Sequence, residues 1–146
     1  MPRLLAVAAL LAAATGCIII DDGPDTVVVD DPVYNRAPRV RDAWATCAYD
    51  TRYRDDILTL EAIVDDPDGW RDVMSVWADV YDDWTGDLVQ SFELYPTDDP
   101  NFWFSDWLVS TTWIDCWYGY YSVDFVAYDS YDAFDVYTTW PATYAP

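Results

Sequence analysis

The fold of this chain is decided by residues 57–81, which read ILTLEAIVDDPDGWRDVMSVWADVY. Apolar side chains recur at every second position on both sides of an acidic break: Leu58, Leu60, Ala62 and Val64 before it, and Met74, Val76, Ala78 and Val80 after it. Successive side chains of an extended chain point to opposite faces, so each set covers one face of a sheet. In the break, Pro67 fixes φ, Asp side chains bond their own backbone and Gly69 permits a positive φ. The stretch predicts two antiparallel strands joined by a sharp turn.

Short alternating segments separated by turns continue along the chain. The expected strands cover residues 40–49, 57–64, 73–81, 88–95, 102–108, 121–128 and 133–140. Seven short strands within about a hundred residues, with no helix needed between them, are typical of an antiparallel β-sandwich. The segment 109–120 is too irregular to assign. We therefore expect a single all-β domain over residues 38–141.

Acidic residues dominate the charge of the chain. Its 146 residues include 27 Asp and Glu against seven Arg, with no Lys and no His, and the formal net charge is −20. A surface of this sign repels the phosphates of nucleic acids, so we expect no nucleic-acid partner, and cations are the natural counterpart. Nearly all the acids are Asp, a residue that favours turns over helix interiors.

The N-terminus has the features of an export signal. Arg3 precedes an apolar run over residues 4–14, and small residues follow up to Cys17. The run is too short to span a bilayer, which predicts a signal peptide over residues 1–16. The sequence ATGC at residues 14–17 resembles the lipobox of bacterial lipoproteins, with Ala where Leu is usual. An ordinary Cys beside an ordinary cleavage site is the alternative interpretation of Cys17.

The lipoprotein resemblance implies an anchor and a location. Lipidation of Cys17 would place a diacylglycerol on its sulfur and an acyl chain such as palmitate on its new amino group, which holds a protein at a membrane surface without spanning it. By the sorting rule of that family, Ile18 in place of Asp implies the outer membrane, with the domain periplasmic or surface-exposed. Residues 17–37 carry several Asp and Pro and are expected to form an extended acidic tether. A short added strand at residues 27–29 is the alternative.

Cys47 and Cys116 are the two other cysteines, and after export they would occupy an oxidising compartment. A disulfide is the default for such a pair. In the expected topology both lie at the same end of the sandwich, where they can meet. Two Cys without His do not form a zinc site.

Parts of the expected domain resemble bacterial immunoglobulin-like and fibronectin type III-like modules. The pattern YxVxFxAxD at residues 121–129 resembles the penultimate strand of these folds, with Tyr121 in the place of the tyrosine-corner residue. The pattern AxVxDPDG at residues 62–69 resembles their second strand and the following turn. The usual inter-sheet Cys pair is absent, and Ser130 and Tyr131 stand where a Gly is expected. The resemblance implies an immunoglobulin-like sandwich.

Acid-rich turns are expected to meet at one end of this sandwich. If consecutive strands alternate in direction, the turns after the second, fourth and sixth strands share a pole. These turns carry the candidate metal ligands Asp65, Asp66, Asp68, Asp98, Asp99, Asp129 and Asp132. Clustered carboxylates suit Ca²⁺, which takes about six to eight oxygen ligands. Alternatively, Asp simply forms the turns and keeps the surface hydrated; the chain has no EF-hand loop.

Aromatic residues form a second candidate site. The candidate ligand-binding residues are Trp77, Trp103, Trp107, Trp113 and Trp117. Exposed Trp and Tyr beside Asp are what sugar-binding sandwiches use to stack on pyranose rings and to accept bonds from hydroxyls. Alternatively, these aromatics cover the second face of the sheet or pack under loops.

The composition disfavours catalysis. Without His or Lys the chain cannot form a Ser-His-Asp triad or a Schiff base, and it has no Gly-rich phosphate loop. We expect a non-catalytic, lipid-anchored protein of the cell envelope with a structural or adhesive role, and a protein or glycan at the cell surface as partner. A carbohydrate-binding module is the alternative, and a calcium-stabilised adhesion domain is a third interpretation.

Overall fold

The computed structural model describes residues 34–117 and 119–144. The expected signal peptide, the expected lipidation residue Cys17 and residues 17–33 of the expected tether lie outside the described residues. The described residues form eight strands, two 3-10 turns and no α-helix. The elements are β1 (Arg39–Asp50), β2 (Asp55–Asp65), η1 (Trp70–Asp72), β3 (Val73–Asp82), β4 (Leu88–Pro96), β5 (Phe102–Leu108), η2 (Val109–Thr111), β6 (Tyr121–Asp129), β7 (Phe134–Thr139) and β8 (Ala142–Tyr144).

The predicted all-β fold and its seven strands are confirmed. Each predicted strand agrees with β1 to β7 to within two residues at either end, because the alternation of apolar residues follows the pleat of the sheet. The short strand β8 was not predicted. Among the described residues, none lies in a helix with the length and hydrophobicity needed to span a lipid bilayer.

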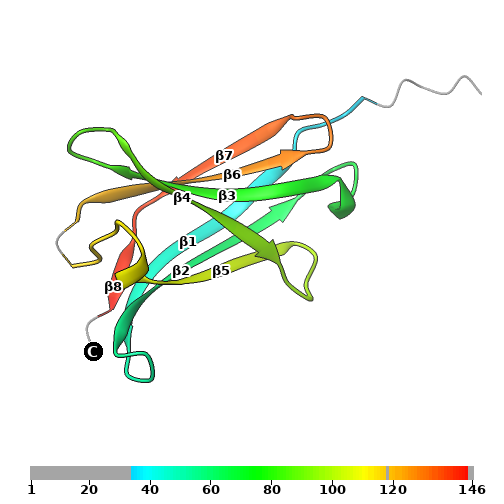
Figure 1. Cartoon of the computed structure of the whole chain (residues 1–146). Coiled ribbons are helices and arrows are strands. Elements are labelled where there is room, and N and C mark those ends of the chain that lie inside the picture. Colours follow the sequence, from blue (N-terminus) through cyan, green and yellow to red (C-terminus); the bar gives the residue numbers. More distant parts are fainter. Residues whose placement is uncertain (1–33, 118, 145–146) are drawn as a thin grey trace, which may run out of the picture. The chain divides into compact units, whose positions relative to one another are not determined.

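The eight strands form one sheet in the order β7-β6-β3-β4-β5-β2-β1-β8; the strands are labelled in Figure 1. Neighbouring strands are antiparallel except β1 and β8, which run parallel. Strand β4 pairs with β3 along most of its length and with β5 only at its end, where Tyr95 faces Phe104 and Pro96 faces Trp103. It therefore links the group β3, β6 and β7 to the group β1, β2 and β5.

The sheet also closes on itself, since β1, the neighbour of β8, lies beside the terminal strand β7. The backbone N–H of Val40 donates a hydrogen bond to Asp135 Oδ2 at 3.0 Å. The Tyr137 hydroxyl donates one to Asp42 Oδ1 at 3.3 Å. The sheet is thus curled into a nearly barrel-like body around one core.

One hydrophobic cluster fills this body. Its largest fully buried side chains come from β1, β2, β3, β4 and β6 and from the residue before β1: Leu58, Leu60, Val64, Val76, Val80, Phe92, Leu94, Val123, Phe125, Cys47 and Pro38. The alternating residues of β2 are all inside, as the sequence predicted. Burying such side chains contributes roughly 1.5–3 kcal/mol each.

The start of β3 departs from the predicted alternation. Met74, predicted to face the core, is 63% exposed, and Val73 is buried in its place. The pairing of β3 with β6 shifts between Val73 and Ser75. A β-bulge adds one residue to one strand and so reverses the faces on either side of it. The prediction for Met74 was wrong for this reason.

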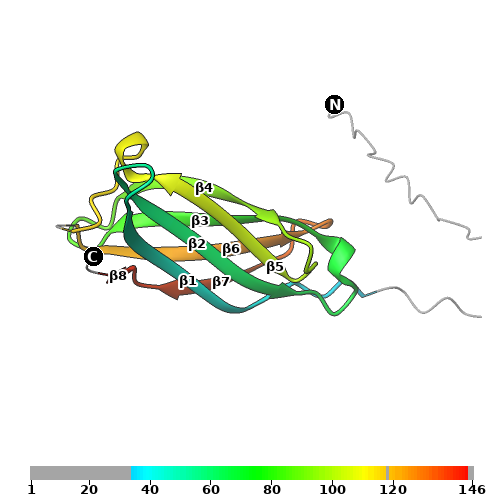
Figure 2. The same ribbon diagram turned by 90° about the horizontal axis from the view of Figure 1, so that it is seen from below.

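The turns gather at two opposite ends of the strands (Figure 2). We call the end with residues 66–72, 97–101 and 130–133 the acidic pole. There the backbone N–H of Val64 donates to the carbonyl of Asn101 at 2.8 Å, and the Ser130 hydroxyl donates to Asp72 Oδ1. We call the other end, with residues 51–54, 83–87, 109–117 and 119–120, the disulfide pole.

Candidate functional site

The acidic pole brings three carboxylates together. In the turn after β2, the backbone N–H of Asp68 donates to Asp66 Oδ1 at 2.7 Å, and Gly69 adopts a φ of 123°. The turn η1 follows, and its Asp72 N–H donates to the carbonyl of Gly69 at 2.8 Å. One carboxylate oxygen from each of Asp66, Asp68 and Asp72 lies within 4.8 Å of the other two. We call these three residues the Asp66 cluster.

Asp66 is the buried member of the cluster. Only 9% of the residue is exposed, and its Oδ2 is a buried atom with no hydrogen-bond partner among the described residues. Burial raises the pKa of Asp66, and repulsion by Asp72, Asp68 and Asp129 raises it further, against the hydrogen bond from the Asp68 backbone. The ionised form of Asp66 is therefore poorly compensated by the protein.

Asp129, at the end of β6, organises the neighbouring turn. It is 2% exposed and accepts hydrogen bonds from Asn35 Nδ2 at 2.7 Å and from the N–H groups of Tyr131 and Ala133 at 2.8 and 2.9 Å. Burial alone would raise the pKa of Asp129, but these three bonds outweigh it and the pKa is lowered. Its carboxylate is already satisfied by the protein.

The other predicted metal ligands have separate roles. Asp65 pairs with Arg41, with nitrogen–oxygen distances of 2.6 and 2.8 Å, and this contact lowers the pKa of Asp65. Asp99 Oδ1 accepts the N–H of Asn101 at 3.0 Å and shapes its turn. Asp98 and Asp132 lie in turns of the same pole, outside the Asp66 cluster. The structure thus brings together two of the predicted residues and adds Asp72, which the sequence analysis missed.

The predicted Trp residues do not form one exposed surface. Trp103 is 6% exposed and belongs to the core. The prediction of Trp103 as an exposed ligand-binding residue is corrected accordingly. Trp107 packs on Phe92 with ring centroids 5.3 Å apart. Trp77 is half-buried on β3. Trp113 is 82% exposed. Trp103 and Trp107 pack in or against the core from β5, whereas Trp77 lies on β3 and Trp113 in the loop before β6.

A concavity of about 510 Å³ lies at the disulfide pole beside the turn between β1 and β2. Its lining includes Tyr49, Tyr53 and Trp107 with the polar residues Asp50, Arg52 and Asp106. Tyr49 and Tyr53 are 44% and 60% exposed. Of this lining, only Trp107 was predicted, because Tyr49 lies near the end of β1 and Tyr53 in the turn after it, and nothing in the sequence pattern marked either as a ligand-binding residue. Stacking surfaces beside hydrogen-bonding groups suit a polar ligand with an apolar face.

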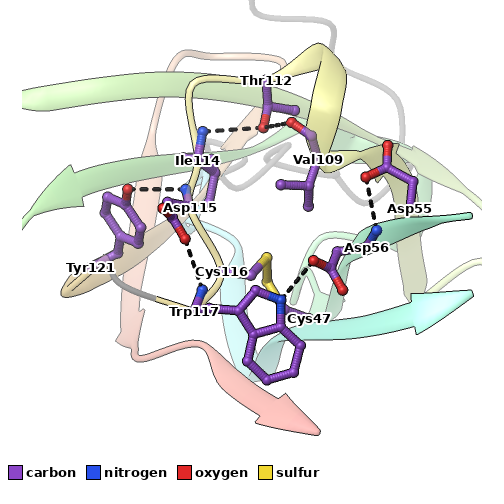
Figure 3. Close-up of a disulfide and its surroundings, with 10 residues drawn as sticks. All are labelled: Cys47, Asp55, Asp56, Val109, Thr112, Ile114, Asp115, Cys116, Trp117 and Tyr121. Atoms are coloured by element: carbon purple, nitrogen blue, oxygen red, sulfur yellow. Dashed lines mark hydrogen bonds between the residues drawn. A yellow bond between two sulfur atoms is a disulfide. The ribbon is translucent and has the colours of Figure 1, made fainter. Parts of the chain in front are cut away.

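The disulfide between Cys47 and Cys116 is present and fixes the long loop before β6 (Figure 3). Their Cα atoms are 5.9 Å apart, and both residues are buried. Next to the bridge, the indole N–H of Trp117 donates to Asp56 Oδ2 at 2.6 Å. The loop, which has no regular strand, is thus attached to both β1 and β2.

Comparison with known proteins identifies no relative. No protein family, no curated protein and no solved structure matches this chain.

Proposed function

We propose that this chain is a lipid-anchored protein of the bacterial cell envelope whose single immunoglobulin-like or fibronectin type III-like domain has a structural or adhesive role. The observation that carries the proposal is the strand order. Strands β1, β2 and β5 are neighbours, as strands A, B and E are in immunoglobulin-like folds, and β3, β6 and β7 are neighbours, as are C, F and G. Strand β4 beside β3 takes the position of C′.

A second contact supports the same fold family. In these folds a Tyr near the start of strand F bonds through its hydroxyl to the backbone a few residues upstream. Tyr121 is the first residue of β6, and its hydroxyl accepts a hydrogen bond from the Asp115 N–H at 3.1 Å. The position and the partner are those expected of a tyrosine corner.

The arrangement of the poles suits a surface role. Residues 35 and 36, which lead into β1, bond to Asp129 and Asp68 at the acidic pole. A domain tethered through its N-terminal segment therefore leaves the disulfide pole and its concavity at the opposite end. The charge of −20 disfavours nucleic acid as partner. The lack of His and Lys in the sequence favours binding over catalysis.

Anchoring is tested by labelling with an alkyne-bearing fatty acid in a Gram-negative host that expresses the full chain. We expect the wild type to carry the label and Cys17→Ser to carry none. We also expect the wild type, but not Cys17→Ser, in the outer-membrane fraction. Wild-type protein that is exported but carries no label would reject the anchor.

Carbohydrate binding is the second candidate function, and the concavity favours it. Tyr49, Tyr53 and Trp107 offer ring faces, while Asp50 and Asp106 offer acceptors for hydroxyl groups. Sugar sites combine these two features. Because Trp107 also packs on Phe92, the two Tyr are the cleaner positions to test.

The test is a glycan array probed with the full chain carrying Cys17→Ser, with and without Tyr49→Ala plus Tyr53→Ala. We expect binding to a defined glycan that falls at least about tenfold in the double variant. Trp84→Ala is the matched control, since Trp84 is 89% exposed and lies outside the concavity. Equal binding by all three proteins would place the sugar site elsewhere.

A further inference from the structure

The Asp66 cluster has the dimensions of a small cation site. An ion with about 2.3–2.6 Å to each oxygen holds its ligands within roughly 5 Å of one another. One oxygen from each of Asp66, Asp68 and Asp72 meets this requirement, since all three lie within 4.8 Å. Asp66 and Asp68 come from a turn that their own backbone bonds hold closed, and η1 brings Asp72 back to them.

The cluster also contains an unsatisfied group. Oδ2 of Asp66 is buried without a hydrogen-bond partner among the described residues, on a residue that is only 9% exposed. Its carboxylate experiences the charges of Asp68, Asp72 and Asp129. A buried carboxylate oxygen in such a place is costly unless a cation or a proton reaches it.

Nearby bases do not neutralise the cluster. Arg36 Nε lies 3.7 Å from Asp68 Oδ1, and the Arg36 side chain is 67% exposed. Arg41 is occupied by Asp65. The Ser130 hydroxyl donates to Asp72 but carries no charge. Among the described residues, the exposed Arg36 is thus the one side chain that forms an ion pair with these three carboxylates.

We propose that Asp66, Asp68 and Asp72 bind one Ca²⁺ ion. Hard carboxylate oxygens are the ligands that Ca²⁺ prefers, and flexible coordination allows carbonyls and water to complete the shell. Asp129 is outside the ligand set because three donors already satisfy it. Asp65 is outside it because it pairs with Arg41.

Binding of Ca²⁺ at this cluster would make the segment that leads into β1 more rigid. The Arg36 N–H donates to Asp68 Oδ2 at 2.7 Å, so one ligand residue also holds the segment before β1. Another ligand residue, Asp72, receives the Ser130 hydroxyl from the turn between β6 and β7. The ion would thus join three separate segments at the acidic pole. This inference does not depend on the proposed adhesive role.

The test measures the melting temperature of the full chain carrying Cys17→Ser, in EDTA and in about 10 mM CaCl₂ at equal ionic strength. We expect Ca²⁺ to raise Tm by about 5 °C, for a Kd of about 1 mM. Asp66→Asn and Asp72→Asn should reduce this shift to less than about 1 °C. Each substitution keeps an oxygen that can accept the bond made by Asp68 N–H or Ser130.

Asp98→Asn is the matched control, because it removes the same charge from an exposed residue of the same pole outside the cluster. We expect it to keep the full Ca²⁺ shift. Isothermal titration should give one site per chain in the wild type and in Asp98→Asn. No shift in the wild type, or an equal shift in Asp66→Asn, would overturn the proposal.

Discussion

The Tyr121 hydroxyl accepts a hydrogen bond from the backbone N–H of Asp115, 3.1 Å away, across the loop that precedes β6 (Figure 3). Gly119 lies under the same ring, and a Cβ atom at that position would overlap it. The loop can pass here only because residue 119 has no side chain. Tyr121 therefore sets the path of the loop as well as filling space beside the core.

Tyr121→Phe keeps the ring and removes the hydrogen-bond acceptor. We expect the free energy of unfolding to fall by about 1 kcal/mol, the usual net value of one hydrogen bond. Urea unfolding monitored by Trp fluorescence measures it. Tyr120→Phe is the matched control, because Tyr120 is 76% exposed. It should leave the free energy of unfolding unchanged. Equal midpoints for the two variants would show that the hydroxyl does not contribute.

Removing the disulfide by Cys47→Ala plus Cys116→Ala should lower the free energy of unfolding by roughly 4 kcal/mol. The bridge closes a loop of 69 residues, and the loss is the entropy that the unfolded chain regains. Urea unfolding of the variant and of the oxidised wild type gives the difference. The wild type in reductant should unfold at the same midpoint as the variant. A variant as stable as the oxidised protein would contradict this prediction.

Asp129→Asn should destabilise the domain by about 2–3 kcal/mol at neutral pH, because the new amide meets the amide donor of Asn35. The lowered pKa of Asp129 means that its contribution is present above the unfolded-state pKa and is lost as pH falls through the folded-state value. The difference in the free energy of unfolding between the variant and the wild type should therefore become smaller in acid. Urea unfolding from pH 7 to about pH 3 tests this, and a gap that widens in acid would disprove it.

Asp66→Asn, in contrast to Asp129→Asn, should stabilise the domain when EDTA removes divalent cations. The raised pKa of Asp66 means that its ionised form is unfavourable in the folded state above the folded-state pKa, and that acid relieves the cost. The variant should melt at a higher temperature than the wild type at pH 7, and the difference should vanish at low pH. Differential scanning calorimetry over this pH range is the measurement. A lower Tm for Asp66→Asn at pH 7 would show that the charge stabilises the turn.

The alternation in the sequence was sufficient to predict β1 to β7 because a strand with one buried face must repeat every two residues. It was not sufficient at Met74, since an apolar residue beside a β-bulge looks the same whether it faces inward or outward. Strand β8 has only three residues and pairs with β1 from far along the chain. No local period could have predicted that pairing.

The candidate sites were predictable only in part. Asp-rich turns indicated the pole, because antiparallel topology places alternate turns together. The cluster contains Asp72 and not Asp98 because the 3-10 turn η1 brings Asp72 close to Asp66 and Asp68. No pattern of apolar residues in the sequence predicts that turn. Trp103 was misjudged since an indole suits a core as well as a binding surface, and only the tertiary packing decides between them.

The bridge between Cys47 and Cys116 spans the turns at residues 51–54, 83–87 and 97–101. A protease that cuts any one of these turns would leave two fragments covalently joined through sulfur. On a gel run without reductant, the nicked molecule would migrate close to the uncut chain, and only a thiol would separate the pieces. Each of these three exposed turns can therefore be cut once without releasing either fragment.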